Sequence, residues 1–157
     1  TQTQTAKKFD QVTPDEISRF MDVNVVALYD VCVQFIKTRE SGSIVNLSSI
    51  YGSVSPRPSL YASGHKHPGY AISKAAVQML TKYLAVHAAP QFRVNCVALG
   101  GVQANQSAEF IQRYSAMLPL KRMSEPEDLV GLLQLLVGPD SDYITGAIIP
   151  ADGGWLA

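Results

Sequence analysis

The sequence predicts an α/β protein in which helices flank a parallel sheet. Stretches with helical spacing of apolar residues alternate with three short apolar segments at residues 44–47, 93–98 and 148–149. Short, mostly apolar runs of this kind are typical of strands buried in a sheet. The order helix, strand, helix, strand, helix, strand suits right-handed crossovers between parallel strands. We therefore expect a layered α/β sheet.

The first helix is expected over residues 14–37. Thr13 can cap it, Pro14 suits its first turn, and Glu16 has the spacing that completes a capping box. Apolar side chains then recur at mostly helical spacing. A polar turn at residues 39–43 separates this helix from the first strand.

The second helix is expected over residues 70–89, after a loop rich in Ser, Pro, Gly and His that extends to Gly69. Pro90 bars its continuation. Two histidines flank a lysine at residues 65–67 of the loop. We interpret them as part of a solvated loop, because no third metal ligand is evident, and we assign no metal site.

The last third of the chain predicts two more helices. A weak helical pattern covers residues 107–118, and a capping-box signature at residues 124–127 precedes an apolar helix that Gly138 ends. Three short parallel strands make a poor domain by themselves. We therefore expect one edge of the sheet to pair with strands that this chain does not contain.

The composition excludes several classes of partner. Lys plus Arg equals Asp plus Glu at 13 each, so the sequence predicts no binding to nucleic acid or to an anionic membrane. No run approaches the roughly 20 apolar residues of a membrane span, and the polar start is unlike a signal peptide. Cys32 and Cys96 lack metal or redox spacing and predict buried, reduced thiols in a cytoplasmic protein.

The ends of two predicted strands mark the expected site. Ser48 and Ser49 follow the first strand, and Leu99 and Gly100 end the second. In open parallel sheets, ligands bind beyond the carboxyl ends of the strands. The sequence therefore predicts a binding site that these residues share.

Tyr70 and Lys74 stand four apart at the start of the second helix, so they share one face. A lysine ammonium beside a phenol stabilises the phenolate, and we expect Lys74 to lower the pKa of Tyr70. The pair would then serve as an acid and base near neutral pH. By itself, however, this spacing also describes an ordinary exposed helix pair.

Five segments in one order strengthen the functional interpretation. They are DVNV (22–25), IVNLSSIYG (44–52), YAISK (70–74), RVNCVALG (93–100), and YITG (143–146) continuing to DGG (152–154). Together they resemble the short-chain dehydrogenase/reductase family over essentially the whole chain. The resemblance implies the C-terminal part of a Rossmann-like, doubly wound parallel sheet. It also implies NAD or NADP as cofactor and a small alcohol or carbonyl compound as substrate.

The resemblance implies four catalytic residues. Tyr70 would donate or accept the substrate proton, and Lys74 would tune Tyr70 while hydrogen-bonding the nicotinamide ribose. Ser49 would polarise the substrate oxygen, and Asn24 would hold a water that relays protons to Lys74. Tyr61 lies at a more usual distance from Ser49 but lacks a lysine four residues later. Choosing Tyr70 implies an insertion before the helix.

The resemblance also implies cofactor contacts after the second strand, from Leu99, Gly100 and Val102, in addition to Tyr70 and Lys74. Here the chain departs from the family pattern. Leu99 replaces the usual proline, and Ala104 stands near the position of a threonine that contacts the cofactor. We expect Asn105 to substitute for that hydroxyl.

The family's Gly-rich dinucleotide-binding half would precede residue 1. We therefore expect residues 1–157 to be the catalytic part of one Rossmann-type domain that binds cofactor poorly by itself. Homodimers or homotetramers are common in the family. The alternative is a truncated, non-catalytic module for oligomerisation or interaction, against which the complete catalytic set argues. The polar segment at residues 103–106 hints at a polar, sugar-like substrate.

Overall fold

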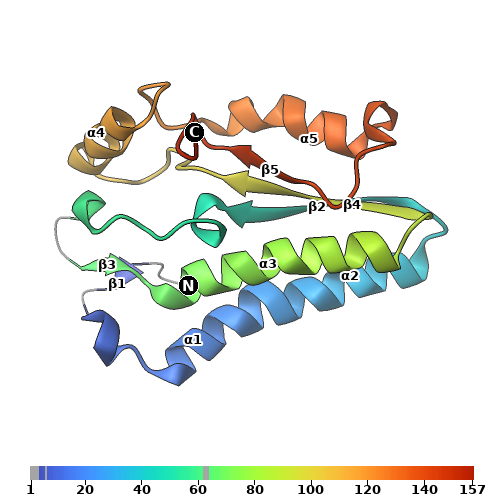
Figure 1. Cartoon of the computed structure of the whole chain (residues 1–157), viewed down its shortest axis with the longest axis horizontal. Helices are drawn as coiled ribbons and strands as arrows, with labels where there is room; N and C mark the ends of the chain where they lie inside the picture. Colours follow the sequence, from blue (N-terminus) through green and yellow to red (C-terminus); the bar gives the residue numbers. More distant parts are fainter. Residues whose placement is uncertain (1–3, 6, 62–63) are drawn as a thin grey trace.

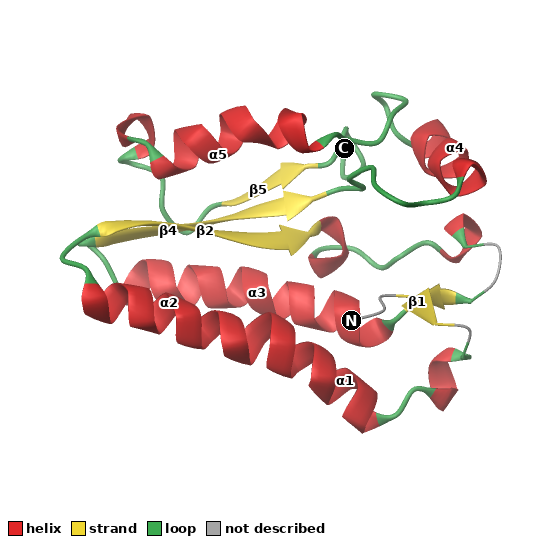
Figure 2. Ribbon diagram, turned by 180° about the vertical axis from the view of Figure 1, so that it is seen from behind, coloured by secondary structure: helices red, strands yellow, loops and turns green. Residues whose placement is uncertain are grey.

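A three-stranded parallel sheet forms the middle of three layers in the structure, a computed structural model that describes residues 4–5, 7–61 and 64–157 (Figures 1 and 2). The strand order is β2-β4-β5, and helices cover both faces. The strands are β2 (Gly42–Ser49), β4 (Phe92–Leu99) and β5 (Ile148–Ala151). The predicted α/β parallel sheet is confirmed.

The first helical segment runs from residue 14 to residue 38 with one irregularity. It comprises α1 (Pro14–Met21), a π-helical turn (Asp22–Val26) and α2 (Ala27–Thr38). The predicted capping box is present, because Glu16 N donates to Thr13 Oγ1 (3.4 Å) and Thr13 N donates to Glu16 Oε2 (2.9 Å). The sequence predicted the extent of this helix but not its π-helical turn.

Helix α3 (Pro68–His87) packs against β2 and β4 beside the first helical segment, on the face of the sheet opposite α5 (Val130–Val137) (Figure 1). It begins two residues before the predicted start. The reason is a cap that the sequence did not reveal: the His67 ring accepts a hydrogen bond from Gly69 N at its Nδ1 atom (3.1 Å). Pro68 then suits the first turn.

The predicted capping box at residues 124–127 is wrong by one residue. Glu125 N donates to Asp128 Oδ2 (2.8 Å), and a short 3-10 turn (Pro126–Leu129) leads into α5. Asp128 also pairs with Arg122, so the acidic side chain that fits this geometry is not the one that the spacing suggested. Helix α4 (Ala108–Met117) lies where the weak helical pattern predicted it.

The segment at residues 52–69 is more structured than the predicted loop. A 3-10 turn (Pro58–Leu60) interrupts it, and β3 (His65–Lys66) pairs antiparallel with β1 (Gln4–Thr5). Two-residue strands carry no periodicity, and their partner lies some 60 positions away in the chain. Sequence patterns therefore could not predict this ribbon.

The strand register brings the expected site residues together. Ser49 lies opposite Leu99, and Leu99 lies opposite Ala151. Cys32 and Cys96 are buried free thiols, as predicted. No helix in the described part of the chain is long and apolar enough to cross a membrane.

Candidate active site

One cavity of about 540 Å³ lies beyond the carboxyl ends of β2 and β4. Six of the seven predicted site residues line it: Ser49, Tyr70, Lys74, Leu99, Gly100 and Val102. They come from two strand ends and the start of α3, which lie far apart in the sequence. We predicted that residues at the carboxyl ends of the strands share one binding site, and these residues do line one cavity. Their individual roles stay predictions.

The two serines that follow β2 hold different positions. Ser48 links β2 to α3, because its hydroxyl donates to the Lys74 carbonyl (2.8 Å). Ser49 caps the short turn after the strand by accepting from Tyr51 N (3.2 Å), and it also hydrogen-bonds Tyr70. A Cβ on Gly52 would lie 2.8 Å from the Lys74 carbonyl, so only glycine allows this turn to pack on α3. Of the two serines, Ser49 is therefore the one whose hydroxyl contacts Tyr70.

Tyr70 is half-buried at the start of α3. Burial raises the pKa of its phenol, and the hydrogen bond with Ser49 acts in the opposite direction. We expected Lys74 to lower this pKa, and that expectation is wrong for the structure. Lys74 Nζ lies 5.8 Å from the Tyr70 ring centroid and donates to the Leu47 carbonyl (3.0 Å). Desolvation of the phenolate is the main cause of the raised pKa, and Lys74 is not among the groups that shift it.

Asn24 does not line this cavity. It lies in the π-helical turn, where its Nδ2 donates to Ser73 Oγ (2.9 Å), and Ser73 Oγ donates to the Tyr70 carbonyl (2.9 Å). It lines a neighbouring hollow of about 440 Å³ whose wall includes Lys74. Leu47 and Lys74 line both the hollow and the cavity, so the two spaces adjoin there. π-Helical turns occur often at functional sites, and this one places Asn24 against α3.

Sequence reasoning missed Lys66, which reaches the same cavity from β3. Its Nζ lies 4.6 Å from the Tyr70 ring centroid, within the range of a cation–π contact. Burial lowers the pKa of Lys66. Lys66 stands four residues before Tyr70, but the two belong to different elements, β3 and α3, so helical spacing does not predict their contact.

Three tyrosines complete the wall. Tyr61, which we considered and set aside as the acid, lies with its hydroxyl 3.5 Å from that of Tyr51. Tyr114 accepts a hydrogen bond from Gly101 N at its hydroxyl (2.7 Å) and stacks on Trp155 at 4.8 Å between ring centroids. Tyr114 thereby holds the backbone that follows β4.

The histidines of the 65–67 segment do not form a solvated loop, and that interpretation is wrong. His67 is buried, stacks on Phe20 with ring centroids 4.7 Å apart, and caps α3. Burial lowers the pKa of His67. Because its Nδ1 accepts from Gly69 N, the neutral ring is the form that caps the helix.

The segment after β4 differs from expectation at one position. Asn105 is exposed, whereas Gln106 lines the cavity and donates from Nε2 to the Val102 carbonyl (2.9 Å). Gln106 Oε1 also accepts from Ala104 N (2.7 Å). Gln106, not Asn105, supplies the polar side chain beside the cavity.

This arrangement can polarise an oxygen atom and exchange a proton with it. A hydroxyl of Ser49 and a phenol of Tyr70 face one space, and two ammonium groups adjoin it. Among its described lining residues there is no Asp or Glu and no metal-binding group. Proton transfer at a substrate oxygen is the chemistry that these side chains support.

Comparisons with known proteins agree with this geometry. A family model described as enoyl-(acyl carrier protein) reductase matches residues 1–156. Dehydrogenase/reductase SDR family member 4 of Homo sapiens is 33% identical over 153 residues, covering 91% of this chain and 52% of that protein. Galactitol 2-dehydrogenase (L-tagatose-forming) of Cereibacter sphaeroides is 32% identical over 162 residues, covering 96% and 61%.

Among solved structures, a short chain dehydrogenase from Leptospira borgpetersenii with bound NAD+ superposes with a TM-score of 0.89 at 36% identity. The match covers 98% of this chain and 61% of that one. The chain thus spans about half to three fifths of the length of these relatives. The ordered motifs, the cavity that they form and a family model matching nearly every residue lead to one conclusion: this chain belongs to the short-chain dehydrogenase/reductase family.

Proposed function

We propose that the protein carrying this chain is an NAD(P)-dependent oxidoreductase that interconverts an alcohol and a carbonyl compound. The observation that carries the proposal is the convergence of Ser49, Tyr70 and Lys74 on one cavity at the carboxyl ends of two parallel strands. Relatives support the cofactor class, since one neighbouring structure holds NAD+ and a gluconate 5-dehydrogenase from Burkholderia cenocepacia holds NADP.

The cavity fits the nicotinamide end of such a cofactor. Its wall includes the backbone from Leu99 to Val102 and the Lys74 ammonium, which can donate to ribose hydroxyls. A Cβ on Gly100 would lie 2.8 Å from Asp152 Cα, so glycine is required where this wall turns away from β4. The 157 residues contain no G-x-x-x-G-x-G segment, and we assign pyrophosphate binding to none of them. When bound, the cofactor would supply or accept the hydride.

Residues of this chain would transfer the proton to or from the substrate oxygen. Ser49 Oγ donates a hydrogen bond to the substrate oxygen, where negative charge develops during carbonyl reduction. Tyr70 then transfers its phenolic proton to that oxygen, or accepts a proton from it in the reverse direction. The raised pKa of Tyr70 keeps the phenol protonated at neutral pH, which suits proton donation. Asn24 and Ser73 would orient the start of α3 through their hydrogen bonds to each other and to the Tyr70 carbonyl.

A polar, sugar-like substrate fits the side chains around the reacting groups. Tyr61, Gln106 and Lys66 supply hydroxyl, amide and ammonium groups to the same cavity. Relatives with related specificities include galactitol 2-dehydrogenase and the 2-dehydro-3-deoxy-D-gluconate 5-dehydrogenase of Dickeya dadantii, which is 30% identical over 167 residues. We propose a polyol or a sugar acid as the substrate class.

We also propose that the protein assembles as a homodimer or homotetramer in the cytoplasm. Helix α3 presents a stripe of apolar side chains that are about half exposed or more: Ile72, Met79, Tyr83 and Val86. Burial of such a stripe against another copy would stabilise an assembly. This surface would also serve the alternative function, a non-catalytic oligomerisation module, which predicts assembly without turnover.

Turnover by the full-length protein tests the proposal. Oxidation of NADH and NADPH, and reduction of NAD and NADP, would be followed with a panel of polyols, sugar acids and their carbonyl counterparts. We expect Tyr70→Phe to lower kcat by roughly 10³-fold, because the proton donor is removed. Tyr143→Phe is the matched control, since Tyr143 is fully exposed. Unchanged turnover in Tyr70→Phe would refute the assignment, and assembly without any turnover would favour the module.

A further inference from the structure

Helix α3 contacts Ser49 at two points, one on the side chain and one on the main chain. The Ser49 hydroxyl contacts Tyr70. The Ser49 carbonyl accepts a hydrogen bond from Gln78 Nε2 (3.2 Å). Lys74 stands four residues after Tyr70 and four before Gln78, so the three side chains follow one another along one face of the helix. The same helix face therefore contacts both ends of Ser49.

The turn that follows β2 fixes the orientation of the Gln78 amide. Gln78 Nε2 also donates to Ser53 Oγ (3.1 Å), and Ser53 Oγ donates to Gln78 Oε1 (3.2 Å). A Cβ on Gly52 would lie 2.6 Å from Gln78 Nε2, so glycine leaves the space that the amide occupies. Because both amide atoms have partners, the side chain has a defined direction, with Nε2 toward the Ser49 carbonyl.

A second hydrogen bond crosses the same contact in the opposite direction. Ser48 Oγ of the strand donates to the Lys74 carbonyl of the helix (2.8 Å), whereas Gln78 of the helix donates to the end of the strand. A hydroxyl that polarises a substrate oxygen must be placed accurately, since an error of about 1 Å can cost roughly 10²-fold in rate. The main-chain position of Ser49 therefore matters to the proposed reaction, which so far gives Gln78 no role.

We propose that Gln78 is a positioning residue that sets the place of the Ser49 hydroxyl relative to Tyr70 by binding the Ser49 carbonyl. This inference rests on the proposed oxidoreductase function and adds a residue to it. Gln78 is not among the described residues that line the cavity, so it acts on the reaction through Ser49. Removal of the amide lets the end of β2 shift and weakens the contact between Ser49 and Tyr70.

A double-mutant cycle with Ser49 tests this route. Gln78→Met removes the amide from a side chain of similar length, and we expect kcat of the full-length protein to fall by roughly 10-fold. In the Ser49→Ala background the same substitution should lower kcat by less than about 2-fold more, because the group through which Gln78 acts is gone. Ser53→Ala keeps the bond between Gln78 and Ser49 and should cost less than Gln78→Met.

Gln134→Met is the matched control, since Gln134 is exposed on α5, on the other face of the sheet. It makes the same chemical change, and we expect it to retain the kcat of the wild type. Thermal melting reports whether each variant folds. If Gln78→Met does not fold, Gln78→Glu retains the test, because it keeps the shape of the side chain and replaces only the donor Nε2 with an oxygen.

Nuclear magnetic resonance reports the contact between Ser49 and Tyr70 without turnover. In full-length protein with tyrosine labelled by carbon-13 at Cζ, the Tyr70 signal is the one that is missing in Tyr70→Phe. We expect Ser49→Ala and Gln78→Met to change its chemical shift in the same direction. In the Ser49→Ala background, Gln78→Met should cause no further change.

Three outcomes would overturn the proposal. They are a loss of kcat from Gln78→Met that is as large in Ser49→Ala as in the wild type, an equal loss in Gln134→Met, and a Tyr70 signal that Gln78→Met leaves unchanged. The signal also separates this proposal from the function on which it rests. If the Tyr70 signal responds as expected but the wild type converts no substrate of the panel, the oxidoreductase assignment fails and the positioning of Ser49 by Gln78 stands.

Discussion

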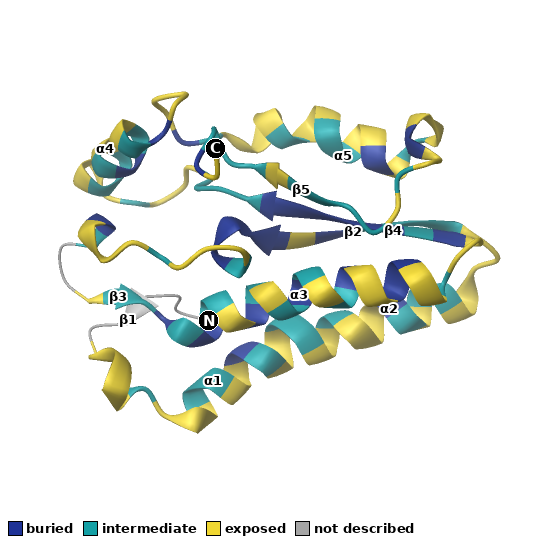
Figure 3. Cartoon of the chain, in the orientation of Figure 1, coloured by how far each residue is buried: buried dark blue, intermediate teal, exposed yellow. Residues whose placement is uncertain are grey.

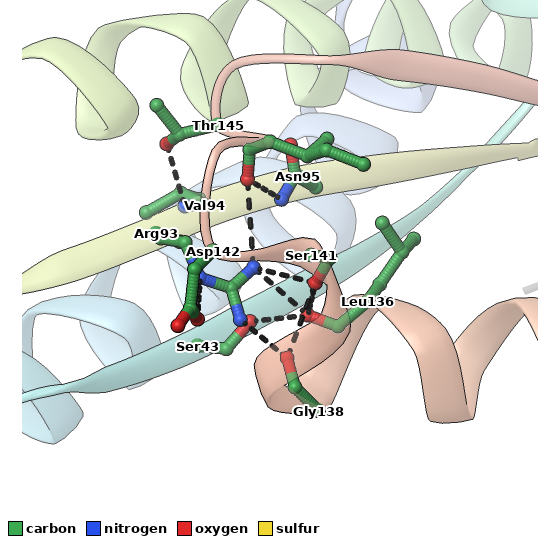
Figure 4. A network of polar contacts seen from close by, with 10 residues as sticks. Ser43, Arg93, Val94, Asn95, Leu136, Gly138, Ser141, Asp142 and Thr145 are labelled. Carbon is green, nitrogen blue, oxygen red and sulfur yellow. Dashed lines mark hydrogen bonds and ion pairs between the residues drawn. The ribbon is translucent and has the colours of Figure 1, made fainter.

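The two ends of strand β4 use polar groups in opposite ways. At its amino end, Arg93 donates to the carbonyls of Leu136 (3.1 Å) and Gly138 (3.0 Å) and to Ser141 Oγ (2.9 Å) (Figure 4). At its carboxyl end, Leu99 and the glycines after it border the cavity. At the amino end of β4 the polar groups hydrogen-bond one another. At its carboxyl end they border a cavity that a ligand can enter.

Neighbouring residues extend the closed network. Asn95 Nδ2 donates to the Ile144 carbonyl (2.7 Å), its Oδ1 accepts from Ala147 N (3.1 Å), and Val94 N donates to Thr145 Oγ1 (3.1 Å). These bonds join the segment between α5 and β5 to β4, the middle strand of the sheet. Most of β4 is buried (Figure 3). Buried polar groups that satisfy each other stabilise a fold, whereas groups aimed into a cavity serve a ligand.

Arg93→Met should have the largest effect, on stability. The substitution removes a guanidinium that satisfies several backbone carbonyls, and we expect the free energy of unfolding to fall by about 3 kcal/mol. The ion pair with Asp142 (3.6 Å) contributes little, because the Asp142 side chain is 77% exposed. Denaturant unfolding measures the change. Arg93→Lys is the matched control: if it were fully stable, the charge and not the planar set of donors would explain the network.

Ser49→Ala should have the opposite profile. We expect kcat to fall by roughly 10²-fold, because a donor to the reacting oxygen is lost, while stability changes by less than about 1 kcal/mol. Steady-state kinetics and unfolding of the same samples provide both values. Ser48→Ala provides the comparison within the pair, and we expect a loss of less than about 10-fold, since that hydroxyl holds the Lys74 carbonyl. If kcat fell more in Ser48→Ala than in Ser49→Ala, the roles assigned to the two serines would have to be exchanged.

His67 sharpens the comparison, because it is a structural residue at the functional end. Its pKa is lowered from the ordinary 6.5, mainly by burial, while the nearby Glu16 charge opposes the shift. The unfolded chain therefore takes up a proton on His67 at higher pH than the folded chain does. The stability that neutral His67 provides is complete above about pH 6.5 and is lost as pH falls through the lowered pKa.

His67→Asn tests this small effect, because asparagine can cap a helix but does not titrate. Between about pH 7 and pH 5, we expect the free energy of unfolding to decrease less steeply in the variant than in the wild type. Thermal or denaturant unfolding across this range measures the two slopes. Parallel slopes would show that His67 protonation is not linked to folding.

Strong local patterns explain most of what the sequence predicted. Short, mostly apolar runs placed β2, β4 and β5, and helical spacing placed α1, α2 and α3 within one or two residues at most ends. Strand-end position and motif order selected Ser49, Tyr70 and Lys74. The errors fell where partners distant in the chain decide local structure, as at His67, or where neighbouring acids compete for one cap, as at Asp128.

The sequence by itself determined the alternation of helices and strands, the parallel sheet and the residues at its carboxyl edge, because periodicity and strand-end position are local properties of the chain. Only the tertiary structure decided the pKa values of those residues and which other side chains contact them. Burial raises the pKa of Tyr70 against our expectation, the π-helical turn contains Asn24 and its hydrogen bond to Ser73, and Lys66 of the β1–β3 ribbon lies over the Tyr70 ring. Desolvation and long-range pairing depend on which distant segments pack together, and no spacing within one segment encodes them.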